Sequence, residues 1–164
     1  MHIHKPFFLK RRSTYVIQAV YFSICFIILY NLNPEIPFLA GADASSWINP
    51  ARMFLKHGAF VLPENPYLDD VYRTPLYPLF NALFIWIGQE HGFRAIVIAQ
   101  IILLSGTSLI IASMSEKLKV GLAAPSMVLT LFNPNCLSTA LLIQSETLFC
   151  FSLTCSCYFL LRYI

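Results

Sequence analysis

Charged side chains are scarce in this sequence. Of its 164 residues, 12% are charged and 57% are hydrophobic, and the mean hydropathy is +0.66. A soluble globular domain carries about 25% charged and about 45–50% apolar residues. With half that charge the chain cannot cover its surface with solvated side chains. The composition therefore excludes an ordinary soluble domain and predicts an integral membrane protein.

Other common signatures are missing as well. The sequence has no internal repeat, no low-complexity segment, no glycine-rich phosphate loop and no N-x-[ST] glycosylation site. All its cysteines lie in or beside apolar runs: Cys25, Cys136, Cys150, Cys155 and Cys157. Cys155 and Cys157 would point about 200° apart on a helix, which is a poor chelate geometry. We interpret the cysteines as small apolar side chains rather than as a zinc site or a disulfide framework.

The basic residues gather before the first apolar run. Lys5, Lys10, Arg11 and Arg12 precede it, and the net charge is only +3. A nucleic-acid patch is the competing interpretation, but this cluster stops where the apolar run begins. The positive-inside rule then predicts a cytoplasmic N-terminus.

The first apolar run, residues 14–32, is long enough to cross a bilayer of about 30 Å. A signal peptide is the alternative, because small residues follow at Ala40-Gly41-Ala42. They lie some ten positions beyond the apolar core, too far for a usual cleavage site. We therefore predict an uncleaved transmembrane helix.

Further apolar runs predict an all-α, polytopic membrane protein. We expect spans at about 94–114, 121–143 and 147–164, an outer loop over 33–74, and a short interfacial or re-entrant helix over 75–88. If 75–88 crosses the membrane, Lys117 and Lys119 lie outside and Glu146 inside. If it stays at the outer face, the lysines are cytoplasmic and Glu146 emerges beside the loop. Its shortness and the positive-inside rule favour the second arrangement.

The loop is expected to contain one amphipathic helix. Asn49 as N-cap and Pro50 at the first helical position predict its start, and Gly58 predicts its end. Arg52 and Lys56 lie on it among apolar residues, a pattern suited to the membrane interface. The run 62–67 contains two prolines and is expected to be extended or irregular.

Three charged residues beside the apolar runs are candidate site residues. Asp43 is the only charge between Ile36 and Ala51, Arg73 directly precedes TPLYP, and Glu146 interrupts an apolar stretch. Ionisable groups in such positions are costly unless they are solvated, paired or functional. The structural alternatives are a turn or cap carboxylate for Asp43, a snorkelling cation for Arg73, and a helix-start carboxylate for Glu146.

The order of these features resembles the N-terminal part of the GT-C superfamily of integral membrane glycosyltransferases. The nearest branch is similar to the bacterial protein-mannosyltransferase-like and aminoarabinose-transferase-like enzymes, which use polyprenyl-phosphate sugars. The matching residues follow a fixed order along nearly the whole chain: Ala42-Asp43, Trp47, Ala51, Leu55, Gly58, Arg73-Thr74-Pro75-Leu76-Tyr77-Pro78, Gln100, Asn133-Pro134 and Ser145-Glu146-Thr147-Leu148-Phe149. Such enzymes run to several hundred residues, so the resemblance implies that this chain is the first third or so of one.

The resemblance implies a site and partners. Asp43 would be the catalytic base for an acceptor hydroxyl, Arg73 would bind the donor phosphate, and Glu146 would be a second catalytic carboxylate that orients the acceptor or holds Mg²⁺ or Mn²⁺. The donor would be a lipid-linked hexose or pentose, and the acceptor a glycan, lipid or protein hydroxyl at the outer face of a bacterial inner membrane. The alternative is a small non-catalytic membrane protein, a subunit or remnant of such an enzyme. A transporter component would require more polar residues in the spans than Gln18, Asn81 and Gln100.

Overall fold

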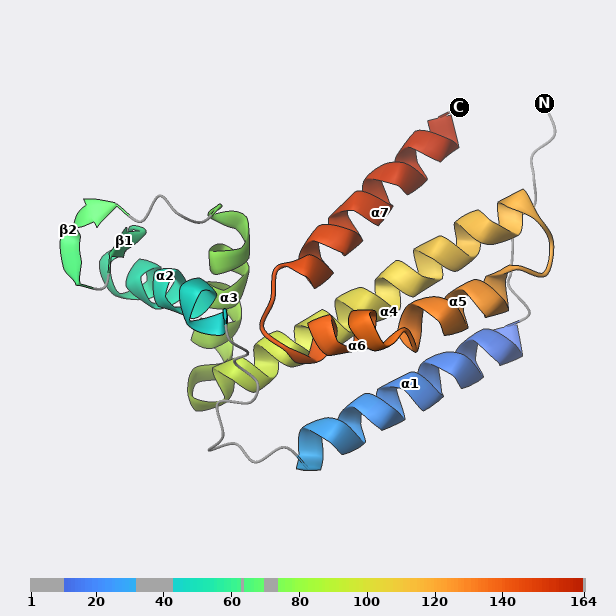
Figure 1. Ribbon diagram of the computed structural model, residues 1–164, viewed down its shortest axis with the longest axis horizontal. Helices are drawn as coiled ribbons and strands as arrows, with labels where there is room; N and C mark the ends of the chain where they lie inside the picture. Colours follow the sequence, from blue (N-terminus) through green and yellow to red (C-terminus); the bar gives the residue numbers. More distant parts are fainter. Residues whose placement is uncertain (1–10, 32–42, 63, 70–73, 164) are drawn as a thin grey trace.

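The computed structural model describes residues 11–31, 43–62, 64–69 and 74–163, and most of them are helical (Figure 1). The helices and strands follow one another in this order: α1 (Arg11–Asn31), α2 (Ala44–His57), β1 (Val61–Leu62), β2 (Asn65–Asp69), α3 (Leu76–Gly88), the 3₁₀ turn η2 (Gln89–His91), α4 (Gly92–Leu118), α5 (Ala123–Leu131), α6 (Pro134–Leu141) and α7 (Glu146–Tyr163). β1 and β2 form a small antiparallel hairpin.

Helix α4 is the central element, and α1, α3, α5, α6 and α7 all pack against it. Small residues on α4 let its neighbours approach closely, as is common between helices in membranes. A Cβ at Gly106 would lie 3.1 Å from the ring of Phe151. The crossing of α4 and α7 therefore depends on the missing side chain at position 106.

Two stretches are long and apolar enough to cross a membrane, Ser13–Asn31 and Leu76–Leu118. A third span would arise if Pro134–Leu141 and Glu146–Tyr163, which meet at 117°, formed one broken span. Length and composition thus support a membrane protein built from helices. The first two stretches contain the predicted spans 14–32 and 94–114, apart from residue 32, which lies outside the described part of the chain.

The predicted span over 121–143 consists of two short helices. Helix α5 ends at Leu131, and α6 begins after Asn133, whose Oδ1 accepts hydrogen bonds from the backbone N–H groups of Asn135 and Cys136. This N-cap accounts for the interruption that Asn133-Pro134 introduces. The 75–88 segment is the separate helix α3, joined to α4 through η2.

The predicted start of the loop helix is wrong. Helix α2 begins at Ala44, with Asp43 in the N-cap position, and Pro50 lies inside it. A proline there removes one intrahelical hydrogen bond and disfavours the helix. The helix continues because Ala44, Ile48 and Ala51 are buried, and this burial offsets the lost bond. Its end is as expected, at Gly58 with φ of 72°.

Polar side chains in the predicted spans join helices to one another. Gln18 of α1 accepts a hydrogen bond from Ser105 and donates one to Ser108, both on α4. The Tyr21 hydroxyl donates to the Ile101 carbonyl at 3.3 Å. Hydrogen bonds of this kind help to hold helices together in a membrane. They give Gln18 a structural role in the association of α1 with α4.

Glu116 is a buried carboxylate that the sequence analysis did not select. It lies near the end of α4, is 8% exposed, and accepts hydrogen bonds from the backbone N–H groups of Gly121 at 2.8 Å and Ala123 at 2.9 Å. These are orphan donors at the start of α5. Glu116 therefore caps α5 from the preceding helix and fixes the turn between α4 and α5.

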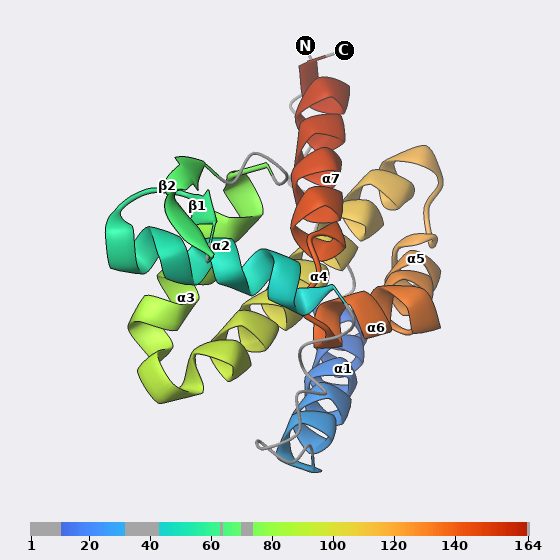
Figure 2. The ribbon, with the colours of Figure 1, turned by 60° about the vertical axis from the view of Figure 1, so that its left-hand side comes forward.

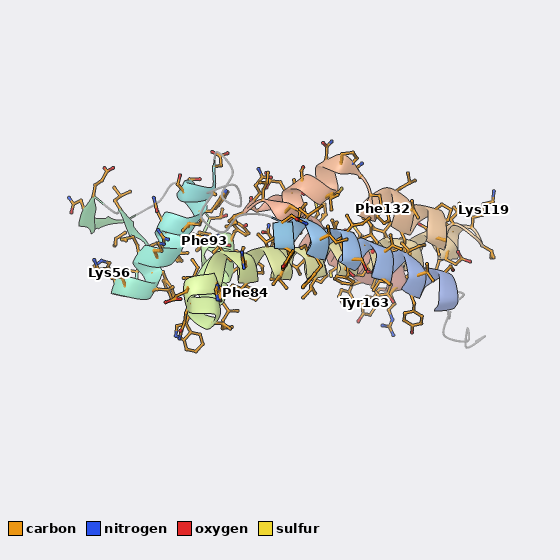
Figure 3. The ribbon with its side chains drawn as sticks, turned by 90° about the horizontal axis from the view of Figure 1, so that it is seen from below. Lys56, Phe84, Phe93, Lys119, Phe132 and Tyr163 are labelled. Carbon is orange, nitrogen blue, oxygen red and sulfur yellow. The ribbon has the colours of Figure 1, made fainter. Side chains whose placement is uncertain are left out.

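Basic side chains lie at both ends of the molecule. Lys56, at the end of α2, and Lys119, just after α4, lie at opposite ends (Figure 3). Helix α1 begins, and α4 and α7 end, toward the side that carries Lys119 (Figure 1). Arg162 is in the last turn of α7, and the Lys117 ammonium lies 5.3 Å from the Tyr158 ring centroid. The basic ends of α4 and α7 are thus on the side away from α2 and the hairpin.

Candidate functional site

A cavity of about 310 Å³ opens between the start of α3 and the start of α7. Both views place the start of α7 on the side of α4 that faces α3 (Figures 1 and 2). The polar lining of the cavity consists of three hydroxyls and one carboxylate, from Thr74, Ser145, Ser152 and Glu146. Its apolar lining consists of Leu76, Tyr77, Leu148 and Phe149. The cavity thus combines aromatic walls with groups that can donate and accept hydrogen bonds.

Glu146 is the one charged side chain among the described residues that line this cavity. It is exposed and is the first residue of α7. The helix dipole favours a carboxylate there. Helix geometry therefore explains why an acidic residue is stable at this position, and its exposure leaves the carboxylate accessible to a bound molecule.

Tyr77 forms the wall opposite α7 and is only 2% exposed. Its hydroxyl has no hydrogen-bond partner among the described residues, and the same holds for both amide atoms of the fully buried Asn81. Asn81 is one turn further along α3. Buried polar atoms without partners are rare in folded proteins, so this group is an unusual feature of the site.

The Tyr77 ring is held in place by two other rings. Trp47 of α2 meets it edge-on, with 5.2 Å between ring centroids, and Phe80 stacks on it at 5.8 Å. Aromatic pairs with these geometries are favourable beyond the area they bury. Through Trp47, the loop helix α2 is packed directly behind the wall of the cavity.

Gln100 fixes the bend that places Glu146 at the cavity. This side chain on α4 is fully buried, and its Nε2 donates to the carbonyls of Gln144 at 2.9 Å and Thr139 at 3.4 Å. The Thr147 hydroxyl also donates to the Thr139 carbonyl. These carbonyls lie at the end of α6 and in the turn to α7, where backbone acceptors lack helical partners. Gln100 is thus a positioning residue for Glu146.

Asp43 lies one helical turn before Trp47. Its side chain is exposed and makes no cap hydrogen bond, although its carbonyl accepts from the Ser46 backbone N–H at 3.1 Å and from the Ser46 hydroxyl at 2.6 Å. The carboxylate is therefore not used to cap α2. Asp43 is not among the described lining residues of the cavity, so the structure relates it to Glu146 only through the contact of Trp47 with Tyr77.

Arg73 lies outside the described residues, so its predicted role in binding phosphate stays a prediction. The next residue in the sequence, Thr74, lines the cavity. As for a divalent ion, no group of three or more His, Cys, Asp or Glu side chains within the described ranges could hold a metal. The two described candidate carboxylates, Asp43 and Glu146, contribute to no such group.

Tyr77, Asn81 and Trp47 are not among the site residues predicted from the sequence. Tyr77 and Trp47 belong to the motif order that carries the family resemblance, and Asn81 is one of a few polar residues in the predicted spans. A polar side chain one turn from a tyrosine, inside an apolar helix, is a signal that could have pointed to them. Comparisons with protein-family models, curated proteins and solved structures found no match to this chain.

Proposed function

We propose that this chain is the N-terminal portion of a GT-C-type membrane glycosyltransferase that transfers a sugar from a polyprenyl-phosphate donor to an acceptor hydroxyl. The supporting observation is the cavity in which Glu146 faces Tyr77, with the Asp43-bearing helix packed behind Tyr77 through Trp47. Residues that are far apart in the sequence, 43–47, 74–77 and 145–149, thus belong to one region. They are the same segments that carry the resemblance to the family.

The chemistry assigns a different task to each group. A phosphate is already a good leaving group, so it needs protonation less than the leaving group in glycoside hydrolysis does. The acceptor hydroxyl needs a base, which contributes about 10²–10⁴-fold to the rate. Asp43 serves as that base because its carboxylate is exposed and free of a capping role. The Arg73 guanidinium donates hydrogen bonds to the phosphate oxygens, and Glu146 orients the acceptor.

The proposed membrane orientation rests on the N-terminal basic cluster. Arg11 and Arg12 open α1, which begins on the side where α4 and α7 end, away from α2 and the cavity. The positive-inside rule assigns that side to the cytoplasm. The site then lies at the outer face of a bacterial inner membrane, α3 lies at the interface, and the N-terminus is cytoplasmic.

Replacement of Asp43 by Asn tests the function. The gene is replaced at its own locus, and membrane vesicles are assayed for transfer of radiolabelled mannose from polyprenyl-phosphate mannose. We expect transfer to fall about 10²-fold or more, as for the loss of a general base. Glu64→Gln is the control, since Glu64 is an exposed carboxylate in the hairpin turn. Near-normal transfer by Asp43→Asn at normal protein level would show that Asp43 is not the base.

A further inference from the structure

We propose that the cavity between α3 and α7 binds a single polyhydroxylated ring of monosaccharide class, with the Tyr77 hydroxyl as a direct hydrogen-bonding partner. The choice of a sugar among hydroxylated rings rests on the proposed function. The size, the walls and the unpaired polar atoms of the cavity are independent of it.

The size of the cavity limits the ligand. Small-molecule sites have volumes of about 300–1,000 Å³, and this cavity, at about 310 Å³, is at the lower end of that range. There is room for one ring and a few water molecules. An oligosaccharide or a polyprenyl chain would have to extend beyond it.

The walls match the two faces of a sugar ring. The exposed Phe149 ring, with Leu76 across the cavity, offers apolar surface to the C–H groups of a sugar. The hydroxyls of Thr74 and Ser145 and the carboxylate of Glu146 offer donors and acceptors to its hydroxyl groups. Glu146 in particular can accept hydrogen bonds from two neighbouring hydroxyls, because its carboxylate is exposed.

The polar atoms of Tyr77 and Asn81 behind the wall can pair with a ligand hydroxyl. Tyr77 is 2% exposed and Asn81 is fully buried, and three of their polar atoms have no hydrogen-bond partner among the described residues. Leaving such atoms unpaired is costly, and a ligand hydroxyl that pairs with one of them removes that cost. Tyr77 is the member of the pair that lines the cavity. Its hydroxyl is enclosed in the free protein, so binding requires the Tyr77 side chain to shift toward the cavity.

The fluorescence of Trp47 provides the test. The chain has two tryptophans, so Trp86→Phe leaves Trp47, which touches Tyr77 at 5.2 Å between ring centroids, as the only reporter. The protein is titrated with the methyl glycosides of mannose, glucose and xylose. We expect at least one glycoside to change the emission saturably. Tyr77→Phe should weaken its binding about three- to tenfold without lowering the thermal midpoint, because the hydroxyl is unpaired in the free protein.

Tyr163→Phe is the matched control, since Tyr163 is 88% exposed at the end of α7, and it should bind as the parent does. An unchanged affinity in Tyr77→Phe, or no response to any of the three glycosides, would overturn the proposal. Competition of a polyprenyl phosphate without a sugar for the same site would overturn it too, because the cavity would then hold the lipid phosphate.

Two measurements separate this inference from the proposed function. Asp43→Asn should abolish mannose transfer but leave glycoside binding unchanged, because Asp43 is not among the described lining residues. If Asp43→Asn keeps transferring mannose while Tyr77→Phe still weakens binding, the proposed base is wrong and the sugar cavity stands. If transfer is lost and no glycoside binds, the cavity proposal alone fails.

Discussion

Trp47 meets Tyr77 edge-on, with 5.2 Å between the ring centroids and an interplanar angle of 89°. This contact joins the loop helix α2 to the helix α3 that lines the cavity. It therefore relates the segment that carries Asp43 to the cavity that Glu146 lines, although Asp43 and Glu146 are about a hundred residues apart in the sequence.

Removing the Trp47 ring should loosen α2. An edge-to-face pair contributes about 0.5–1.5 kcal/mol beyond the area it buries, so we expect Trp47→Leu to speed hydrogen exchange across 44–57 by about threefold to tenfold. Trp86→Leu is the matched control, because Trp86 is 70% exposed on α3. Equal exchange rates in the two variants would show that the pair does not anchor the loop helix.

Gln100 should be required for the stability of the α6–α7 bend. Gln100→Leu removes the donor to the Gln144 carbonyl and one of the two side-chain donors to the Thr139 carbonyl, which keeps the Thr147 hydroxyl. Such a loss costs about 1–3 kcal/mol, which unfolding in mixed detergent micelles by added SDS can measure. Gln89→Leu, at an exposed position in η2, should change stability far less. If the two variants unfold alike, the Gln100 hydrogen bonds do not hold the bend.

Features of the fold that depend on local sequence could be predicted, whereas features that depend on contacts between distant residues could not. Apolar length alone located α1, α4 and α7 to within a few residues. The roles of Gln100 and Glu116 were not predicted, because their partners are chosen by tertiary packing and no local pattern marks them. The start of α2 was misplaced because Pro50 is a strong local signal, and burial of Ala44 and Ile48 outweighs it.

The same contrast holds for the candidate site. Glu146 was selected because it is a charge within an apolar stretch, and it does line the cavity. Tyr77 and Asn81 carry no charge and lie in an apolar helix, so nothing local distinguished them from core residues. That their polar atoms are buried without partners is known only once the surrounding helices are packed.

Glu116 should stabilise the turn between α4 and α5 through both carboxylate oxygens. Each oxygen accepts one backbone N–H, from Gly121 and from Ala123. A glutamine offers one acceptor oxygen, so Glu116→Gln leaves one of the two N–H groups facing an amide donor, at a cost of about 1–3 kcal/mol. Unfolding by added SDS in mixed detergent micelles measures this loss of stability, with Glu90→Gln as the exposed control. A Glu116→Gln protein as stable as the Glu90→Gln control would contradict the capping role.

Gly106 should be replaceable only when Phe151 is made smaller. An added Cβ at position 106 would lie 3.1 Å from the Phe151 ring, so Gly106→Val forces α7 away from α4 and should cost about 1–3 kcal/mol as an overpacked contact. Phe151→Leu in the same chain should recover part of that loss. A double variant no more stable than Gly106→Val would show that the close approach of these helices does not limit packing.

The proposed orientation predicts opposite labelling at the two ends of the molecule. In a chain without its five native cysteines, a cysteine is placed either at Lys119, beyond α4, or at Glu146, at the start of α7. Both positions are exposed. A membrane-impermeant maleimide added to intact cells should label position 146 and spare position 119, because the basic end of the bundle faces the cytoplasm. A permeant maleimide should label both, which controls for reactivity. Labelling of 119 with protection of 146 would reverse the orientation and separate Glu146 from an outer-face site.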